Sequence, residues 1–283
     1  MIRLSAFSDE AGAELSVQLD ALRRNNIYLT ELRSVGGKNV KDLTASEVRE
    51  IATRLSDAGI ALSALGSPMG KVNISVNFDE YLDEVKSMCE TACALGTDRI
   101  RMFSFFEAYG ERSRVIEYLN RMVEAAKSYG LLLCHENEKH IYGDTAERVL
   151  DLKANVEGLR FVYDPANFLQ VGELPEVTLP AIHPICDYFH VKDVDIKTDE
   201  LVPAGHGDGE IARLISMIEG DTMMTLEPHL KAFIGYGAID GSEMRHRFEF
   251  KDGGEAFDAA VAALKGLLTD CGYIEKDGGC FVK

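Results

Sequence analysis

The chain has 283 residues, 46% of them hydrophobic, and its 30 basic and 47 acidic side chains give a formal net charge of −17 at pH 7. This composition is typical of a globular protein and excludes wholesale disorder. The acidic balance disfavours phosphate backbones and anionic membranes as partners, so we expect no nucleic-acid partner and no membrane association.

The cellular compartment of the protein is predicted from its cysteines and its hydropathy. No run of about 18 apolar residues is present, which argues against a membrane span. The first residues lack the apolar stretch of a secretory signal. The six cysteines contain no Cys-x-x-Cys motif. We therefore expect reduced thiols in a cytoplasmic protein.

Short apolar runs alternate with amphipathic segments along the whole chain and predict parallel strands covered by helices. The eight predicted strands span residues 3–7, 28–32, 61–65, 99–103, 131–135, 159–163, 188–191 and 222–226. Eight strand–helix units in a chain of this size favour the α/β class and a single closed (β/α)8 TIM barrel over an open doubly wound sheet. No linker or shift in composition marks a boundary, so residues 1–283 are predicted to form one domain.

Helix ends carry recognisable signals between these strands. Thr44-Ala-Ser-Glu47 predicts a capping box, and Asp144-Thr-Ala-Glu147 predicts the same motif with Asp144 as the cap. Gly96 and Gly130 follow helical patterns and are predicted to take the left-handed position after a helix.

Polar residues at strand ends are the candidates for chemistry, because a (β/α)8 barrel places its site at the carboxyl ends of its strands. The last four predicted strands lead into Glu136, Asp164, His190 and Glu227. Three carboxylates gathered with one imidazole at one barrel mouth need a counter-charge, because like charges a few ångströms apart repel. A lone carboxylate at a strand end is often a helix cap or a surface charge, but four such polar residues in consecutive units, three carboxylates and one histidine, favour a metal site. This donor set suits Mn²⁺, Mg²⁺, Co²⁺ or Zn²⁺.

Several motifs resemble those of the xylose-isomerase-like sugar phosphate isomerase/epimerase superfamily. The segments that carry the resemblance are His135-Glu-Asn-Glu-Lys139, Tyr163-Asp-Pro-Ala-Asn167, His190-Val-Lys-Asp193 and Leu226-Glu-Pro-His229. Earlier segments add to it, namely Glu31-Leu-Arg33, Gly36-Gly-Lys-Asn39, Ser67-Pro-Met-Gly-Lys71 and Arg101-Met-Phe-Ser104. The resemblance covers essentially the whole chain and is specific for the superfamily but not for a substrate.

The resemblance implies one barrel with a metal set of Glu136, Asp164, His190 and Glu227. It also implies an enzyme that isomerises or epimerises a small carbohydrate, which could be a sugar, a sugar phosphate or a keto-polyol. The reaction would be proton transfer through a metal-stabilised enediolate, with Glu136 and Glu227 as acid and base.

Five further residues near the strand ends are predicted to bind substrate. They are Glu31, Arg101, Asn167, Lys192 and His229. Lys192 could equally form an ion pair with a mouth carboxylate, and Glu31 could form a salt bridge with Arg33 or Arg101.

Two departures from the superfamily pattern keep other functions open. Ketose 3-epimerases usually carry His where this chain has Asn167, and they tend to have an Arg in the stretch occupied here by residues 195–197. A metal-dependent lyase, as in inosose dehydratases, is therefore the main alternative. A non-catalytic sugar-binding barrel is another. The endonuclease branch binds three zinc ions, and seven histidines without a basic bias do not favour it.

Four other features allow more than one interpretation. His135 is predicted to lie in the core or to support a ligand, and Asp193 to orient a ligand or cap a helix. Gly205-His-Gly-Asp-Gly209 could line the mouth, but it lacks the lysine of a P-loop. Segment 231–254 could be a substrate lid, a surface hairpin or a subunit contact. The superfamily resemblance also leaves a homo-oligomer open.

Overall fold

The predicted strands form the wall of an α/β barrel in the computed structural model, which describes residues 1–232 and 247–283. The wall strands are β1 (Ile2–Ala6), β2 (Leu29–Leu32), β5 (Ala61–Gly66), β6 (Arg99–Met102), β7 (Leu132–Glu136), β8 (Arg160–Tyr163), β9 (Tyr188–Val191) and β12 (Thr222–Leu226). Their bounds differ from the predicted ones by at most one residue, so the prediction of eight strands is confirmed.

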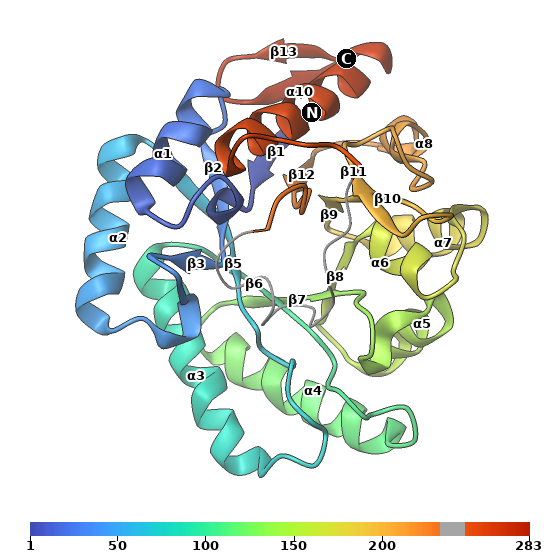
Figure 1. Cartoon of the computed structure of the whole chain (residues 1–283). Coiled ribbons are helices and arrows are strands. Elements are labelled where there is room, and N and C mark those ends of the chain that lie inside the picture. The colour runs from blue at the N-terminus through green and yellow to red at the C-terminus, as the bar shows by residue number, and fades with distance from the viewer. Residues whose placement is uncertain (233–246) are drawn as a thin grey trace.

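Helices surround this wall (Figure 1). They are α1 (Leu15–Arg24), α2 (Ala45–Ala58), α3 (Phe78–Leu95), α4 (Arg112–Ser128), α5 (Ala146–Asn155), α6 (Pro165–Gln170), α7 (Pro175–Ile182), α8 (Ile211–Met217) and α10 (Gly253–Asp270). Short 3-10 turns are η1 (Ser8–Glu10), η2 (Val40–Asp42), η3 (Tyr142–Asp144) and η4 (His183–Ile185). Among the described helices, none combines the length and apolar character that crossing a membrane requires.

Two predicted helix signals had different outcomes. The capping box is confirmed, because Thr44 Oγ1 accepts the Glu47 N–H and the Glu47 carboxylate accepts the Thr44 N–H at 2.8 Å. The cap predicted at Asp144 is wrong. Thr145 caps α5 instead, and the Asp144 carboxylate accepts hydrogen bonds from the Arg148 and Tyr109 side chains.

The wall strands run parallel in the hydrogen-bonded order β1, β12, β9, β8, β7, β6, β5, β2. Leu226 lies opposite Val191, and Tyr163 lies opposite Phe189. The carboxyl ends of these strands therefore meet at one end of the barrel, which we call the mouth. Small hairpins follow two strands there. They are β3 (Ser34–Val35) with β4 (Lys38–Asn39) and β10 (Asp193–Asp195) with β11 (Glu200–Val202).

A C-terminal hairpin packs beside the place where β1 meets β2. Its strands are β13 (Ile274–Lys276) and β14 (Cys280–Val282), and it lies near both chain termini in Figure 1. β14 pairs antiparallel with β1, and Asn26, just before β2, donates a hydrogen bond to Glu275 at 3.0 Å. Thr30 Oγ1 of β2 donates to the Ala6 carbonyl of β1 at 3.0 Å. The hairpin thus ties the first strand to the loop that leads into the second.

We expect Phe281→Ala to lower the free energy of unfolding by about 3–5 kcal/mol, the usual range for deleting a buried Phe. Phe281 is fully buried opposite Ile2, so its removal leaves a cavity under the hairpin. Urea unfolding followed by circular dichroism measures the effect. Ile274→Ala in the same hairpin is the control, because that side chain is 61% exposed and should change stability by less than about 0.5 kcal/mol. Equal effects of the two variants would contradict the expectation.

Candidate metal centre

Four side chains predicted at strand ends come together at the mouth. They are Glu136 from β7, Asp164 just after β8, His190 from β9 and Glu227 just after β12, and we call them the quartet. One donor atom of each lies within 4.8 Å of the others, and all four residues are buried. The register of neighbouring parallel strands produces this meeting, because each residue occupies the end of its strand.

Three atoms of the quartet are buried and make no hydrogen bond with the described part of the chain. They are His190 Nδ1, Asp164 Oδ2 and Glu227 Oε2. His190 Nδ1 lies 3.1 Å from Glu136 Oε1 and 3.2 Å from Glu227 Oε2. Buried polar atoms normally have a partner. Here the two oxygens have an ion-pair contact with Lys192 Nζ, at 2.9 and 3.8 Å, and oxygen and nitrogen atoms of this kind bind divalent cations. The quartet could therefore hold a divalent cation.

Burial and charge oppose each other at the quartet. Burial raises the pKa of Asp164 to about 7, against the attraction of Lys192. Burial also works against ionised Glu227, but Lys192 and His190 outweigh it and hold the pKa of Glu227 well below its usual range. In the same way burial disfavours protonated His190, but the neighbouring glutamates raise its pKa well above the ordinary value. Positive charge placed among the carboxylates therefore stabilises their ionised forms.

The backbone around Asp164 is held on both sides. Its Oδ1 caps α6 by accepting the Asn167 N–H at 2.9 Å. Asn137 Oδ1 accepts the Asp164 N–H at 2.9 Å, and Asn137 Nδ2 donates to the Asp164 carbonyl at 2.9 Å. The predictions omitted Asn137, although it directly follows Glu136 in the sequence. These bonds fix the Asp164 backbone and its Oδ1, whereas Oδ2 is the oxygen that remains for the metal site.

All five predicted substrate-binding residues contact members of the quartet, and three of them are polar or cationic side chains beside Glu136 or Asp164. Arg101 Nε lies 3.2 Å from Glu136 Oε2, and Asn167 Nδ2 donates to Glu136 Oε1 at 3.2 Å. Lys192 Nζ lies 2.9 Å from Asp164 Oδ2, which is the ion pair considered as the alternative for this residue. All three side chains are buried, so each also neutralises or orients a carboxylate.

Glu31 lies on the opposite side of the His190 ring from the rest of the quartet. Its Oε2 is 3.1 Å from His190 Nε2, and its Oε1 accepts a hydrogen bond from the Tyr188 hydroxyl at 3.2 Å. Arg101 Nε is 3.6 Å away, so Arg101 rather than Arg33 is its nearby cation. Glu31 is fully buried.

A second buried cluster adjoins Glu227. Arg33 Nη1 donates to Glu227 Oε1 at 2.9 Å, and the same guanidinium binds both oxygens of Asp9 at 3.0 Å. His229, the fifth predicted substrate-binding residue, donates its N–H to Glu10 at 2.8 Å and has a φ of +47°. Such a left-handed conformation is strained for histidine and often marks functional sites. Asp9 and Glu10 were not predicted, although they follow the first strand just as the quartet follows later strands.

The glycine-rich loop after β9 folds around a carboxylate of the chain itself. The N–H groups of Gly205, Gly207 and Gly209 donate to Asp193 at 2.8, 3.1 and 2.9 Å. A Cβ at Gly207 would lie 2.4 Å from Asp193 Oδ1, so this position requires glycine. Asp193 thus organises the loop, and these amides point to it rather than to a phosphate.

Only the flanks of segment 231–254 belong to the described residues. Lys231 Nζ donates to the Phe250 carbonyl at 2.7 Å, and Arg247 Nη1 lies 3.1 Å from Asp195. Residues 233–246 lie outside the described part, so the choice between lid, hairpin and subunit contact stays a prediction.

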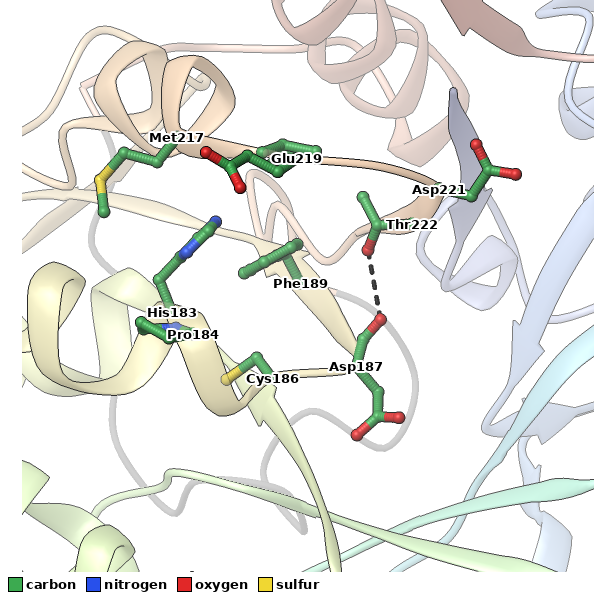
Figure 2. A pocket seen from close by; sticks show the side chains of 10 residues that line it. His183, Pro184, Cys186, Asp187, Phe189, Met217, Glu219, Asp221 and Thr222 are labelled. Carbon is green, nitrogen blue, oxygen red and sulfur yellow. Dashed lines mark hydrogen bonds between the residues drawn. The ribbon is translucent and has the colours of Figure 1, made fainter.

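A cavity of about 550 Å³ lies at the other end of the strands, where β9 and β12 begin (Figure 2). His183, Phe189 and Glu219 are among the residues that line it, and no member of the quartet does. Because barrels place their chemistry at the carboxyl ends of the strands, this cavity is separate from the candidate site.

His135 lies in the core rather than beside the quartet. Its Nε2 is 2.9 Å from Ser104 Oγ, and a Cβ at Gly143 would come within 2.4 Å of its ring. Burial lowers the pKa of His135 to about 3, from an ordinary value of 6.5. The unfolded chain therefore takes up a proton between these values while the folded chain does not, so this contribution to stability is present above pH 6.5 and is lost as the pH falls toward 3.

We expect acidification from about pH 7 to about pH 4.5 to destabilise the wild type by about 2–3 kcal/mol more than His135→Gln, because each pH unit between the two pKa values is worth about 1.4 kcal/mol. Urea unfolding of both proteins at the two pH values measures the difference. An identical loss of stability in both proteins would show that His135 does not titrate in this way.

Comparison with known proteins agrees with the fold. A family model described as xylose isomerase-like TIM barrel matches residues 20–251. The search of curated proteins gives no match. The chain is similar in structure to D-psicose 3-epimerase in the presence of D-fructose, with 16% identity, 95% of this chain and 99% of that chain covered and a TM-score of 0.75.

Two further solved structures are similar over nearly their full length. One is the probable 3-DHS dehydratase AsbF of Bacillus anthracis, with 15% identity, coverage of 94% and 98% and a TM-score of 0.71. The other is the IOLI protein with a zinc atom, with 16% identity, coverage of 95% and 97% and a TM-score of 0.68. At such identities the likeness shows the fold, whereas the family model covers most of the sequence. The chain belongs to the xylose isomerase-like TIM barrel family.

Proposed function

We propose that this protein is a divalent-metal-dependent isomerase or epimerase of a sugar, a sugar phosphate or a keto-polyol. The observation that carries the proposal is the quartet itself. Two glutamates reach one buried point from β7 and β12, together with an aspartate and an imidazole, and the four donor atoms lie within 4.8 Å of one another. The structural likeness to L-ribulose 3-epimerase and to D-psicose 3-epimerase supports the same class of reaction.

Glu136, Asp164, His190 and Glu227 would hold the cation, which on binding supplies Lewis-acid polarisation of a substrate carbonyl. The two glutamates then differ in their surroundings. Arg33 and the ammonium of Lys192 keep Glu227 ionised, which is the form that can accept a proton from the carbon next to the carbonyl.

Glu136 would return the proton from the other side. Arg101 and Asn167 fix its two oxygens, at 3.2 Å each, which orients the carboxylate without closing it off from the cation. Lys192 and His229 are the residues we propose to meet substrate oxygens. Removing a proton with one glutamate and returning it with the other inverts or moves a hydroxyl-bearing centre.

Dehydration is the second candidate, because Asn167 stands where ketose 3-epimerases usually have histidine. Its Nδ2 donates inward to Glu136 and to the Asn137 carbonyl at 2.9 Å, so its amide is engaged within the protein. After the proton next to the carbonyl is removed, the substrate would lose the hydroxyl of its β-carbon, which takes up a proton and leaves as water. The structural likeness to a probable dehydratase supports keeping this candidate.

Incubation in deuterated water tests the proposal. The Mn²⁺-loaded protein is given a panel of ketoses, ketose phosphates and keto-polyols, and nuclear magnetic resonance follows deuterium at the carbon beside the carbonyl. An isomerase or epimerase gives a product that differs in mass from the substrate only by the incorporated deuterium. A dehydratase gives a product that has also lost one water. Binding of a sugar without any exchange, and with the same affinity after metal removal, would contradict both and identify a sugar-binding barrel.

A further inference from the structure

Glu31 has no solvent-facing atom with which to meet a substrate. Its exposed fraction is 0%, and both of its oxygens have partners inside the barrel. Oε2 faces His190 Nε2 at 3.1 Å, and Oε1 accepts from the Tyr188 hydroxyl at 3.2 Å. Arg101 Nε, 3.6 Å from Oε1, supplies the nearest positive charge.

The His190 ring presents its two nitrogens to different groups. Nε2 faces Glu31, whereas Nδ1 faces Glu136 and Glu227 inside the quartet. Carboxylate oxygens accept hydrogen bonds, so each ring nitrogen can donate a hydrogen to the carboxylate that it faces. A cation held by the quartet would take the place of the hydrogen on Nδ1, and the imidazole would then keep its one hydrogen on Nε2, beside Glu31.

Other contacts keep the ring in this orientation. Phe7 meets it edge-on, with ring centroids 5.2 Å apart and planes at 84°. Tyr188, two residues earlier on β9, lies 5.6 Å away by ring centroid and also holds Glu31. Glu31 comes from β2 and His190 from β9, strands that are not neighbours in the sheet. The hydrogen bond therefore spans the barrel interior.

We propose that Glu31 is a positioning residue that fixes the tautomer and the direction of His190, so that Nδ1 is the nitrogen offered to a bound cation. This inference rests on the proposed metal centre and assigns Glu31 a role other than substrate binding. Metal-binding histidines generally donate their second N–H to an acceptor of this kind, and loss of the acceptor weakens metal binding by about 10–100-fold.

Titration of the full chain with Mn²⁺, read from the electron paramagnetic resonance of free Mn²⁺, tests the proposal without a substrate. Glu31→Ala should weaken Mn²⁺ binding by about 10–100-fold, and Glu31→Gln, which keeps one acceptor oxygen, should weaken it less. Two controls are matched to it. Tyr188→Phe removes only the other bond of Glu31, and Asp144→Asn neutralises a buried carboxylate paired with Arg148 outside the quartet. Both should stay within about threefold of the wild type, well under the loss expected from removing the acceptor.

The outcomes separate this inference from the proposed function. A wild type that binds no Mn²⁺ overturns the metal centre and this inference together. A wild type that binds Mn²⁺ while Glu31→Ala binds it equally well overturns only the role of Glu31. Circular dichroism of each variant confirms that it is folded.

A second measurement uses the wild type alone and does not depend on a variant folding. Nitrogen-15 resonance of the ring-labelled, Zn²⁺-loaded protein should show His190 with its hydrogen on Nε2 and the metal on Nδ1, with the signal assigned by its loss in His190→Gln. The reverse assignment, with the hydrogen on Nδ1, would overturn the proposal.

Discussion

Asp164→Asn is expected to reduce Mn²⁺ uptake from about one ion per chain to less than a tenth of that under the same conditions, a larger loss than the 10–100-fold typical of residues behind the ligands. The amide keeps the shape of the side chain and its Oδ1 bond to the Asn167 N–H. It removes the charge of Oδ2, the buried atom that lies 2.9 Å from Lys192 Nζ. Elemental analysis after gel filtration measures the bound metal.

The control for this variant is Asp144→Asn, because Asp144 is also a buried carboxylate but binds Tyr109 and Arg148 instead of the quartet. It should retain the uptake of the wild type. Equal metal content in Asp164→Asn and the wild type would mean that the cation, if bound, lies elsewhere.

Glu227→Gln and Glu136→Gln are each expected to lower proton exchange by about 10²–10⁴-fold, the usual contribution of a general acid or base. The measurement is deuterium incorporation into the best substrate of the panel, made at Mn²⁺ concentrations that saturate each variant. Because saturation separates metal loss from loss of the proton-transferring group, the remaining defect reports the chemistry.

Glu138→Gln is the matched control for these two variants. Glu138 is buried two residues after Glu136, but its Oε2 pairs with Lys71 at 2.8 Å and it is not part of the quartet. Its exchange rate should change by less than tenfold, below the range expected for a general acid or base. If Glu138→Gln were as slow as Glu227→Gln, the assignment of acid and base to the quartet would be wrong.

The barrel wall could be predicted because its strands are short apolar runs that alternate with amphipathic helical segments. The meeting of the quartet followed from one rule, since parallel strands bring their carboxyl ends together. The capping box at Thr44 was equally local. The cap of α5 was not, because Asp144 and Thr145 both suit that position and contacts with Tyr109 and Arg148 decide between them.

The sequence does not reveal side-chain contacts between strands that lie on different sides of the barrel. The bond between Glu31 and His190 joins strands far apart in the sheet, and the bidentate pair of Arg33 with Asp9 joins the ends of two further segments. The C-terminal hairpin was also not predicted. Its strands have three residues each, too few to show a period of two, and Glu275 and Lys276 resemble a surface turn.

The most direct test of the metal centre is a crystal structure of the protein with Mn²⁺, with the ion located by its anomalous scattering. We predict one peak at about 2.0–2.3 Å from a donor atom of each of Glu136, Asp164, His190 and Glu227, as expected for such cations. A fully occupied peak elsewhere, with the quartet bound only to Lys192 and the arginines, would contradict it.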